Sequence, residues 1–171
     1  VEFDGDAVRA LSMPERMTLC NMSAELGAQT GLVAPDEVTR DWLRDAGVAD
    51  LGDTASTAGS ADTADPLYWH SDADAERTLH TFAAATLAPQ VALPHSPALA
   101  RPISEVDAVP VQVAYIGACT GAKIDDLRAA AAVLRGQRVA VGVRLMVAPA
   151  SQRDLRHAQD EGVLQALQSA G

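Results

Sequence analysis

Residues 113–123 read Val-Ala-Tyr-Ile-Gly-Ala-Cys-Thr-Gly-Ala-Lys and mark the passage from an apolar strand to an Ala/Leu-rich helix. We expect Cys119 to follow the carboxyl end of the strand, beside backbone N–H groups that the next helix leaves free. Those N–H groups and the helix dipole favour thiolate over thiol. A thiolate there suits a soft metal, an iron–sulfur cluster or a nucleophile, and an inert buried cysteine is the plain alternative.

The pattern around this stretch predicts a βαβα order. A strand over 110–117 leads to a helix over 124–135, which Gly136 closes. A second strand over 141–148 follows, and helices fill 151–170. These elements predict an α/β fold, a three-layer α/β/α domain with an N-terminal helical arm.

Composition and pattern divide the chain into four parts. Residues 1–46 form the helical arm, 47–66 a flexible loop rich in Ala, Ser, Thr and Asp, 67–109 a mixed connecting segment, and 110–171 the βαβα lobe that carries Cys119. In the connecting segment, alanine content favours a helix over 72–88, and periodicity alone does not decide its structure.

The arm is predicted to hold helices over 6–12, 14–28 and 35–46, with Pro14 in the first turn of the second helix. In that helix Asn21 and Glu25 are spaced i, i+4 and share one face. The apolar set on the neighbouring face is expected to point into a core, and its members are Met17, Cys20 and Ala24.

Charge and composition exclude several classes of function. The formal net charge is −10 and the pI is near 4.6, without a basic stripe, which argues against binding to nucleic acid or to an anionic membrane. No apolar run is long enough for a membrane span, and no secretion signal is visible. The two cysteines are therefore expected to be reduced thiols in a cytoplasm.

Three stretches of the chain resemble the aconitase superfamily, in particular the large subunit of 3-isopropylmalate dehydratase and homoaconitase. The first begins Leu-Ser-Met-Pro-Glu-Arg-Met-Thr-Leu-Cys-Asn-Met-Ser-Ala-Glu-Leu-Gly-Ala (11–28) and continues at 31–37. The second covers 91–97 and 102–106, and the third covers 115–120 and 125–130. The resemblance implies a strand around 77–82, where alanine content favours a helix.

The resemblance implies a 4Fe–4S cluster held by three cysteines, whose open iron acts as a Lewis acid on a hydroxylated substrate. Cys119 matches the first cluster cysteine. The other two form a Cys-x-x-Cys pair in the family, and these 171 residues contain none. We therefore expect that the chain does not hold the cluster alone.

Asn21 and Glu25 match the family's Asn-x-x-x-Glu pair. The resemblance implies that they reach the site and steer the protonation of the departing hydroxyl. An ordinary polar helix face is the alternative reading of such a pair.

Departures from the family pattern lie close to Cys119. The family usually reads Gly-Ser-Cys-Thr-Asn-Gly-Arg over 117–123. This chain has instead Ala118 for the Ser, Gly121 for the Asn, Ala122 for the Gly and Lys123 for the Arg. A family Pro-Gly-Ser appears as Pro149-Ala150-Ser151, and Ala is a poor residue where positive φ is required.

Two hypotheses follow. The first is a portion of an aconitase-type isomerising hydro-lyase acting on a hydroxylated di- or tricarboxylate such as isopropylmalate or homocitrate. The missing partners would then be further domains or a small swivel subunit. The second is a free-standing, cluster-free relative that serves as a binding module or has other chemistry. A lone domain that exposes surfaces made for neighbours would tend to form a homodimer.

Overall fold

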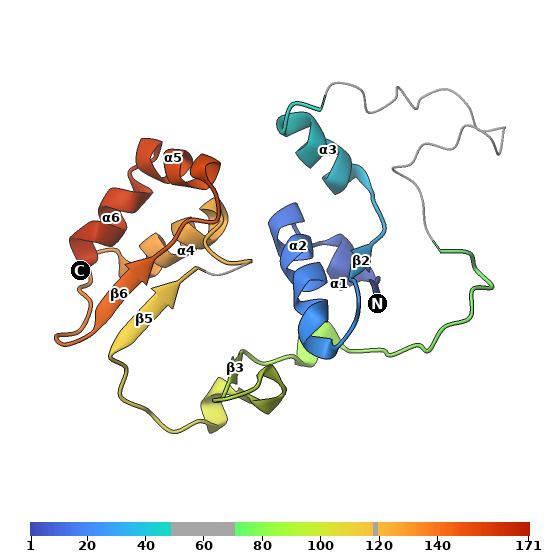
Figure 1. Cartoon of the computed structure of the whole chain (residues 1–171), viewed down its shortest axis with the longest axis horizontal. Helices are drawn as coiled ribbons and strands as arrows, with labels where there is room; N and C mark the ends of the chain where they lie inside the picture. The colour runs from blue at the N-terminus through green and yellow to red at the C-terminus, as the bar shows by residue number, and fades with distance from the viewer. Residues whose placement is uncertain (49–70, 118–119) are drawn as a thin grey trace. The chain divides into compact units, whose positions relative to one another are not determined.

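The computed structural model describes residues 1–48, 71–117 and 120–171 (Figure 1). They form two compact units, Val1–Ser104 and Glu105–Gly171, each of which is described by itself. Among the described residues, no helix is both long and apolar enough to span a bilayer.

The first unit contains short helices, a parallel strand pair and a β-hairpin. Strand β1 pairs with β2 in parallel, and β3 pairs with β4 in antiparallel. The bounds are β1 Glu2–Phe3, α1 Asp6–Arg9, α2 Met13–Asn21, η1 Met22–Leu26, β2 Leu32–Val33, α3 Glu37–Asp45, η3 Ala84–Thr86, β3 Gln90–Ala92, η4 Pro97–Leu99 and β4 Ala100–Pro102; η5 Ile103–Glu105 follows at the junction with the second unit.

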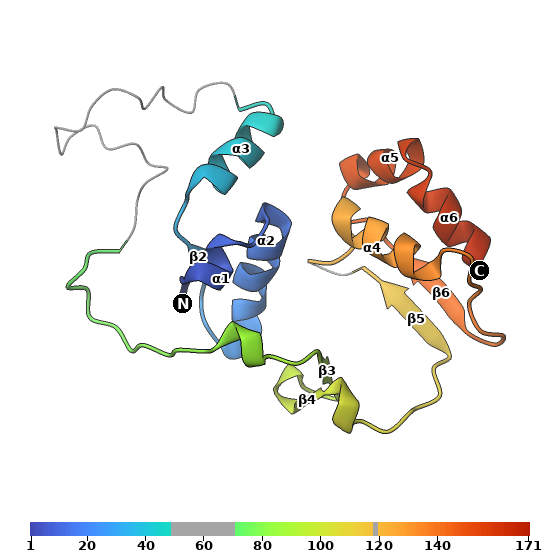
Figure 2. The same ribbon diagram turned by 180° about the vertical axis from the view of Figure 1, so that it is seen from behind.

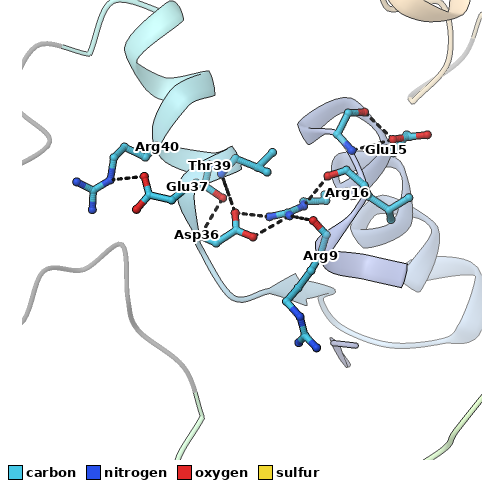
Figure 3. Close-up of polar contacts among 10 residues, drawn as sticks. Arg9, Glu15, Arg16, Asp36, Glu37, Thr39 and Arg40 are labelled. Carbon is cyan, nitrogen blue, oxygen red and sulfur yellow. Dashed lines mark hydrogen bonds and ion pairs between the residues drawn. The ribbon is translucent and has the colours of Figure 1, made fainter. Parts of the chain in front are cut away.

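A buried arginine ties α2 to the start of α3 (Figure 3). Arg16 is 2% exposed, and its Nη1 and Nη2 atoms donate to the two carboxylate oxygens of Asp36 at 2.7 and 2.8 Å. Its Nε atom donates to the carbonyl oxygen of Leu11 at 3.0 Å, and its Nη2 atom also donates to the carbonyl oxygen of Arg9 at 2.8 Å. The buried charge is therefore paired and hydrogen-bonded, as burial of a guanidinium requires.

Asp36 also caps α3. One of its oxygens accepts the N–H groups of Val38 and Thr39 at 3.0 and 3.3 Å, which satisfies two of the free donors at the helix start. The hydrogen bonds from Arg16 are the main cause that lowers the pKa of Asp36. The predicted helix over 35–46 is confirmed as α3, one or two residues shorter at each end.

The predicted helix over 14–28 is shorter than expected. Helix α2 ends at Asn21, and the chain continues as the 3₁₀ helix η1 to Leu26. The hydroxyl of Ser23 donates to the carbonyl of Cys20 at 2.7 Å, an alternative to continued helical bonding. Gly27 then ends the segment at φ 82°.

The expectation that Ala24 faces a core is wrong, because Ala24 is exposed and Ser23 is the buried residue of η1. Met17 and Cys20 are half-buried. Gly31 explains the tight packing here, since a Cβ at Gly31 would lie 2.6 Å from the carbonyl oxygen of Cys20. Any larger residue would push the loop away from α2.

Residues 72–88 form neither the helix that alanine content favours nor the strand that the family resemblance implies. They are exposed throughout, and the short turn η3 at 84–86 is the one regular element among them. Small residues without a buried apolar face give a segment little reason to adopt either regular structure.

The second unit confirms the βαβα order. Its elements are β5 Val113–Ile116, α4 Ile124–Leu134, β6 Arg144–Val147, α5 Gln152–Asp160 and α6 Val163–Ala170. Strands β5 and β6 pair in parallel, from Val113 opposite Arg144 to Ile116 opposite Val147. A parallel pair joined through α4 is the expected βαβ unit, with strands shorter than the sequence predicts.

One face of the β5–β6 pair carries the core of this unit. Figures 1 and 2 show the strand pair beside the helices α4, α5 and α6. Ile116 and Val147 pack against a cluster of buried residues from the α4 turn and the three helices, namely Ala122, Leu127, Ala131, Ala158 and Leu167. On the other face Tyr115 is 55% and Met146 43% exposed. The described residues of this unit thus form two layers, so mixed α/β structure is established, whereas the three-layer arrangement, the helical arm and the four-part division stay predictions.

Candidate functional site

Cys119 lies outside the described residues. The structure does describe the turn that follows it in the sequence. This turn runs from Thr120 to Lys123 and leads directly into α4. Ala122 is 1% exposed and has φ 60°, the left-handed region that L-residues avoid. Gly121 lies so close to the preceding chain that a Cβ there would be 2.5 Å from the carbonyl oxygen of Gly117.

These two positions are also positions at which the sequence departs from the family pattern. The turn has no room at Gly121 for the Asn side chain that the family carries there. At Ala122 the backbone adopts the conformation for which glycine is suited, and alanine occupies it with strain. The expectation of such strain at Ala150 is wrong, because Ala150 does not have positive φ. The strain lies one loop away, at Ala122.

Hydrogen bonds from three directions hold the turn. The ammonium group of Lys123 donates back to the carbonyl of Thr120. The N–H of Ala150, in the loop after β6, donates to the carbonyl of Ala122 at 2.9 Å. The backbone N–H of Lys123 donates to a carboxylate oxygen of Asp126 at 3.0 Å. Asp126, in the acidic first turn of α4, therefore holds the backbone at the helix start.

Asn21 and Glu25 occupy different kinds of helix. Asn21 is the last residue of α2 and Glu25 lies in η1, and both side chains are exposed. Their i, i+4 spacing therefore does not stack them on one continuous α-helical face, contrary to expectation, because the helix changes type between them. Their role as a pair stays a prediction.

Glu25 lines an open hollow of about 300 Å³ in the first unit. The other lining residues are apolar, namely Phe3, Leu19, Met22, Leu26, Pro97 and Ala98, and Asn21 is not among them. Glu25 is the one charged side chain among the described residues around this hollow. A carboxylate at an apolar hollow is suited to proton transfer with a ligand that lies against it.

Cys119 belongs to the second unit, whereas Asn21 and Glu25 belong to the first. The convergence of the three residues on one site therefore stays a prediction. It rests on the family resemblance and not on a measured distance.

The residues of this chain do not fit a complete 4Fe–4S site. Such clusters are held mainly by cysteine thiolates, and the sequence has two cysteines. Cys20 is half-buried, and burial raises the pKa of its thiol, which disfavours the ligating thiolate. Among the described residues, no group of three or more His, Cys, Asp or Glu side chains is arranged to hold a metal ion. Cys119 stays the candidate ligand, and the others would have to come from outside these residues.

Sequence reasoning missed two polar residues that hold these structures together. One is Arg16, and the available signal was that it is the one basic residue of α2. The other is Asp154, which accepts the N–H of Ile124 at 2.9 Å from across the unit. Its signal was the pattern Ser151-x-x-Asp154, which resembles a helix-capping box.

Comparison with known proteins identifies the class to which this fold and these motifs belong. The family model described as aconitase family (aconitate hydratase) matches residues 1–109 and 104–171. The chain belongs to the aconitase family.

Its relatives include large subunits of two kinds of enzyme. It is 39% identical over 171 residues to 3-isopropylmalate dehydratase large subunit 1 of Methanopyrus kandleri, covering 100% of this chain and 38% of that protein. It is 40% identical to the 3-isopropylmalate dehydratase large subunit of Oleidesulfovibrio alaskensis, covering 37% of it. It is also 39% identical to the probable methanogen homoaconitase large subunit of Methanosarcina mazei, covering 40% of it. The chain thus spans about two-fifths of the length of these relatives.

Proposed function

We propose that this chain is a portion of an aconitase-type hydro-lyase that isomerises a hydroxylated di- or tricarboxylate, such as isopropylmalate or homocitrate. The observation that carries the proposal is the family match, which extends over both units. Relatives named for 3-isopropylmalate and for homoaconitase match it about equally well, at 39 and 39% identity, so both substrates belong to the proposal.

In this proposal Cys119 supplies one ligand to a 4Fe–4S cluster, which provides Lewis-acid chemistry when it is bound. Glu25 exchanges a proton with the substrate. A base outside these residues removes the proton from the carbon next to the hydroxyl-bearing carbon, while a protonated Glu25 donates to the hydroxyl group, which leaves as water as the C=C bond forms. When water adds back to the double bond, the Glu25 carboxylate accepts its proton and the protonated base returns a proton to the other carbon. The amide of Asn21 orients the same hydroxyl by a hydrogen bond.

The apolar lining around Glu25 supports this role. A carboxyl group beside apolar side chains meets little competition from solvent once a ligand covers it. We place the whole enzyme in the cytoplasm, in amino-acid biosynthesis, with further domains or a small subunit to complete the site.

The test uses the complete polypeptide that contains this chain, purified anaerobically with the small subunit. Dehydration of 3-isopropylmalate and of homocitrate is followed by the ultraviolet absorbance of the unsaturated product. We expect Glu25→Gln to lower kcat by about 10²- to 10⁴-fold, the usual contribution of a general acid, with the iron content unchanged.

Glu76→Gln is the matched control, because Glu76 is an exposed glutamate of the same unit that lines no described hollow. It should retain wild-type kcat. If Glu25→Gln is as active as Glu76→Gln on both substrates, Glu25 is not the acid. If the wild type turns over neither substrate while it holds a full cluster, the proposed substrate class is wrong.

The cluster-free binding module is the second candidate, and one observation favours it. The turn after Cys119 has Gly121 and Ala122 where the family usually has Asn and Gly, and Ala122 adopts a left-handed conformation that alanine disfavours. Iron content separates the two candidates, because the module would bind a hydroxylated polycarboxylate in titration calorimetry without any iron.

A further inference from the structure

Helix α4 begins at a residue that does not cap it in the usual way. Its N-cap position is Lys123, whose side chain has donors and no acceptor. The first N–H groups of a helix have no partner within the helix, and Ser, Thr, Asp or Asn at the N-cap normally accepts one of them. Helix α4 must obtain an acceptor from elsewhere.

That acceptor comes from α5. The Oδ1 atom of Asp154 accepts the N–H of Ile124, the first residue of α4, at 2.9 Å and across 30 positions of sequence. The Oδ2 atom of Asp154 accepts the hydroxyl of Ser151, and that hydroxyl in turn accepts the N–H of Asp154 at 3.1 Å. Ser151, the N-cap residue of α5, thus holds Asp154 in place through its hydroxyl, and the other carboxylate oxygen of Asp154 binds α4.

The same corner supports the strained turn. Ala150 precedes Ser151 in the chain, and its N–H donates to the carbonyl of Ala122 at 2.9 Å. The segment 150–154 therefore contacts the chain on both sides of Lys123, at Ala122 and at Ile124. An alanine in the left-handed conformation is found only where neighbouring contacts stabilise that conformation. The hydrogen bond from Ala150 is such a contact for Ala122.

We propose that Asp154 is a positioning residue. It fixes the turn 120–123 by accepting a hydrogen bond from the backbone N–H of Ile124. The importance of this positioning for catalysis rests on the proposed role of Cys119 as a ligand. The positioning itself is tested by measurements that need neither a cluster nor activity.

The first measurement is amide hydrogen exchange in the 171-residue chain, with Asp154→Ala compared with Asp154→Asn. Alanine removes the acceptor, whereas asparagine keeps a carbonyl oxygen in its place. A hydrogen bond to a carboxylate shifts the equilibrium from the open, exchanging form to the hydrogen-bonded form by roughly a factor of ten or more. Asp154→Ala should therefore speed amide exchange at Ile124 at least tenfold. Asparagine should restore the rate to within about threefold of the wild type.

The second measurement is iodoacetamide labelling of Cys119, with Cys20 in the other unit as the internal reference. The labelling ratio of Cys119 to Cys20 should rise at least threefold in Asp154→Ala, because a turn without its tether opens more often. Asp160→Ala is the control, since Asp160 is an exposed aspartate at the far end of α5. It should change neither the ratio nor the exchange at Ile124.

Ser151→Ala covers the case in which Asp154→Ala does not fold. This variant keeps the Asp154 carboxylate but removes the hydroxyl that orients it. Amide exchange at Ile124 should therefore increase, by a smaller factor than in Asp154→Ala. The proposal is overturned if Ile124 exchange and the labelling ratio stay at wild-type values in folded Asp154→Ala. It is also overturned if asparagine fails to restore them, or if exchange at Leu127, deeper in α4, rises as much as at Ile124. The last result would show general loosening of the helix and not release of the turn.

Discussion

At Ala122 the backbone conformation favours glycine, whereas the burial of the side chain favours alanine. The φ of 60° is a glycine conformation, which costs an L-residue about 1–2 kcal/mol. The methyl group is 1% exposed and belongs to the core of its unit, where a buried carbon contributes about 0.8 kcal/mol. Sequence comparison with the family found the position, because alanine replaces the usual glycine. Only the structure shows that the strain is present there and absent from Ala150.

These terms predict that Ala122→Gly is nearly neutral. Relief of the left-handed strain offsets the lost methyl group and the greater freedom of glycine in the unfolded chain, so the free energy of unfolding should change by less than about 0.5 kcal/mol. Urea unfolding followed by circular dichroism measures it.

Ala131→Gly is the matched comparison, because Ala131 is also a core alanine but lies inside α4. There glycine loses the methyl contact and helix propensity without relieving strain, a cost of about 2 kcal/mol. Equal losses in the two variants would mean that Ala122 is not strained in solution.

At the scale of elements, periodicity predicted the second unit and α3, whereas the four short strands of the first unit were missed. The βαβα order after residue 110 and helix α3 could be read from apolar spacing, glycines and acidic caps. The end of α2 could not, because it depends on the hydroxyl of Ser23 and on the close approach of Gly31, which comes from a later part of the chain. A local pattern carries no information about such a contact.

The contact between α2 and α3 leads to a second prediction on stability. Asp36→Asn leaves the guanidinium of Arg16 buried without a counter-charge, although an oxygen remains to cap α3. Removal of one partner from a buried pair costs about 3–5 kcal/mol, and we expect about 2 kcal/mol here because the Asp36 side chain is 36% exposed. Urea unfolding followed by tryptophan fluorescence reports on this unit, since Trp42 lies in α3.

The stability lost in Asp36→Asn should depend on pH, and the direction follows from the pKa of Asp36. The pKa of Asp36 is lowered in the folded state by Arg16, so its contribution is complete above the unfolded-state pKa of about 3.9. It is lost as the pH falls through the folded-state value. The stability difference between wild type and Asp36→Asn should therefore be constant near neutral pH and shrink below about pH 4.

Asp4→Asn provides the control for this element. Asp4 pairs with Arg9 at 2.5 Å, but the two side chains are 77 and 56% exposed. An exposed pair contributes about 0–1 kcal/mol, so this variant should lose far less than Asp36→Asn. Similar losses in both would show that the burial of Arg16 adds nothing to the strength of its pair.

At the scale of the whole molecule, the proposed site is divided. Asn21 and Glu25 lie in one unit and Cys119 in the other, and the chain covers 38% of its relative from Methanopyrus kandleri. The sequence identified the family and its motif residues because those are local patterns. It did not place them in space, because a local pattern carries no information about the arrangement of the two units. One face of β5 and β6 is exposed in this chain, whereas parallel strands are usually covered on both faces. This exposure is consistent with a chain that spans only part of the length of its relatives.

The last prediction concerns the cluster in this incomplete setting. When the 171-residue chain is incubated anaerobically with iron and sulfide and then desalted, it should not retain a 4Fe–4S cluster. A cluster needs several thiolates, and burial raises the pKa of the Cys20 thiol, which leaves Cys119 as the single suitable ligand. Iron and sulfide per chain, visible absorbance and elution volume are the measurements.

Two variants make the result specific. Any iron that the chain retains weakly should be lost in Cys119→Ser and kept in Cys20→Ser, because only the first removes the proposed ligand. Four irons retained by a monomer would contradict the prediction and would mean that oxygen or nitrogen ligands of this chain complete the site. Equal iron in both variants would instead separate Cys119 from metal binding, and the proposed function would then depend on the proton-transfer role of Glu25 alone.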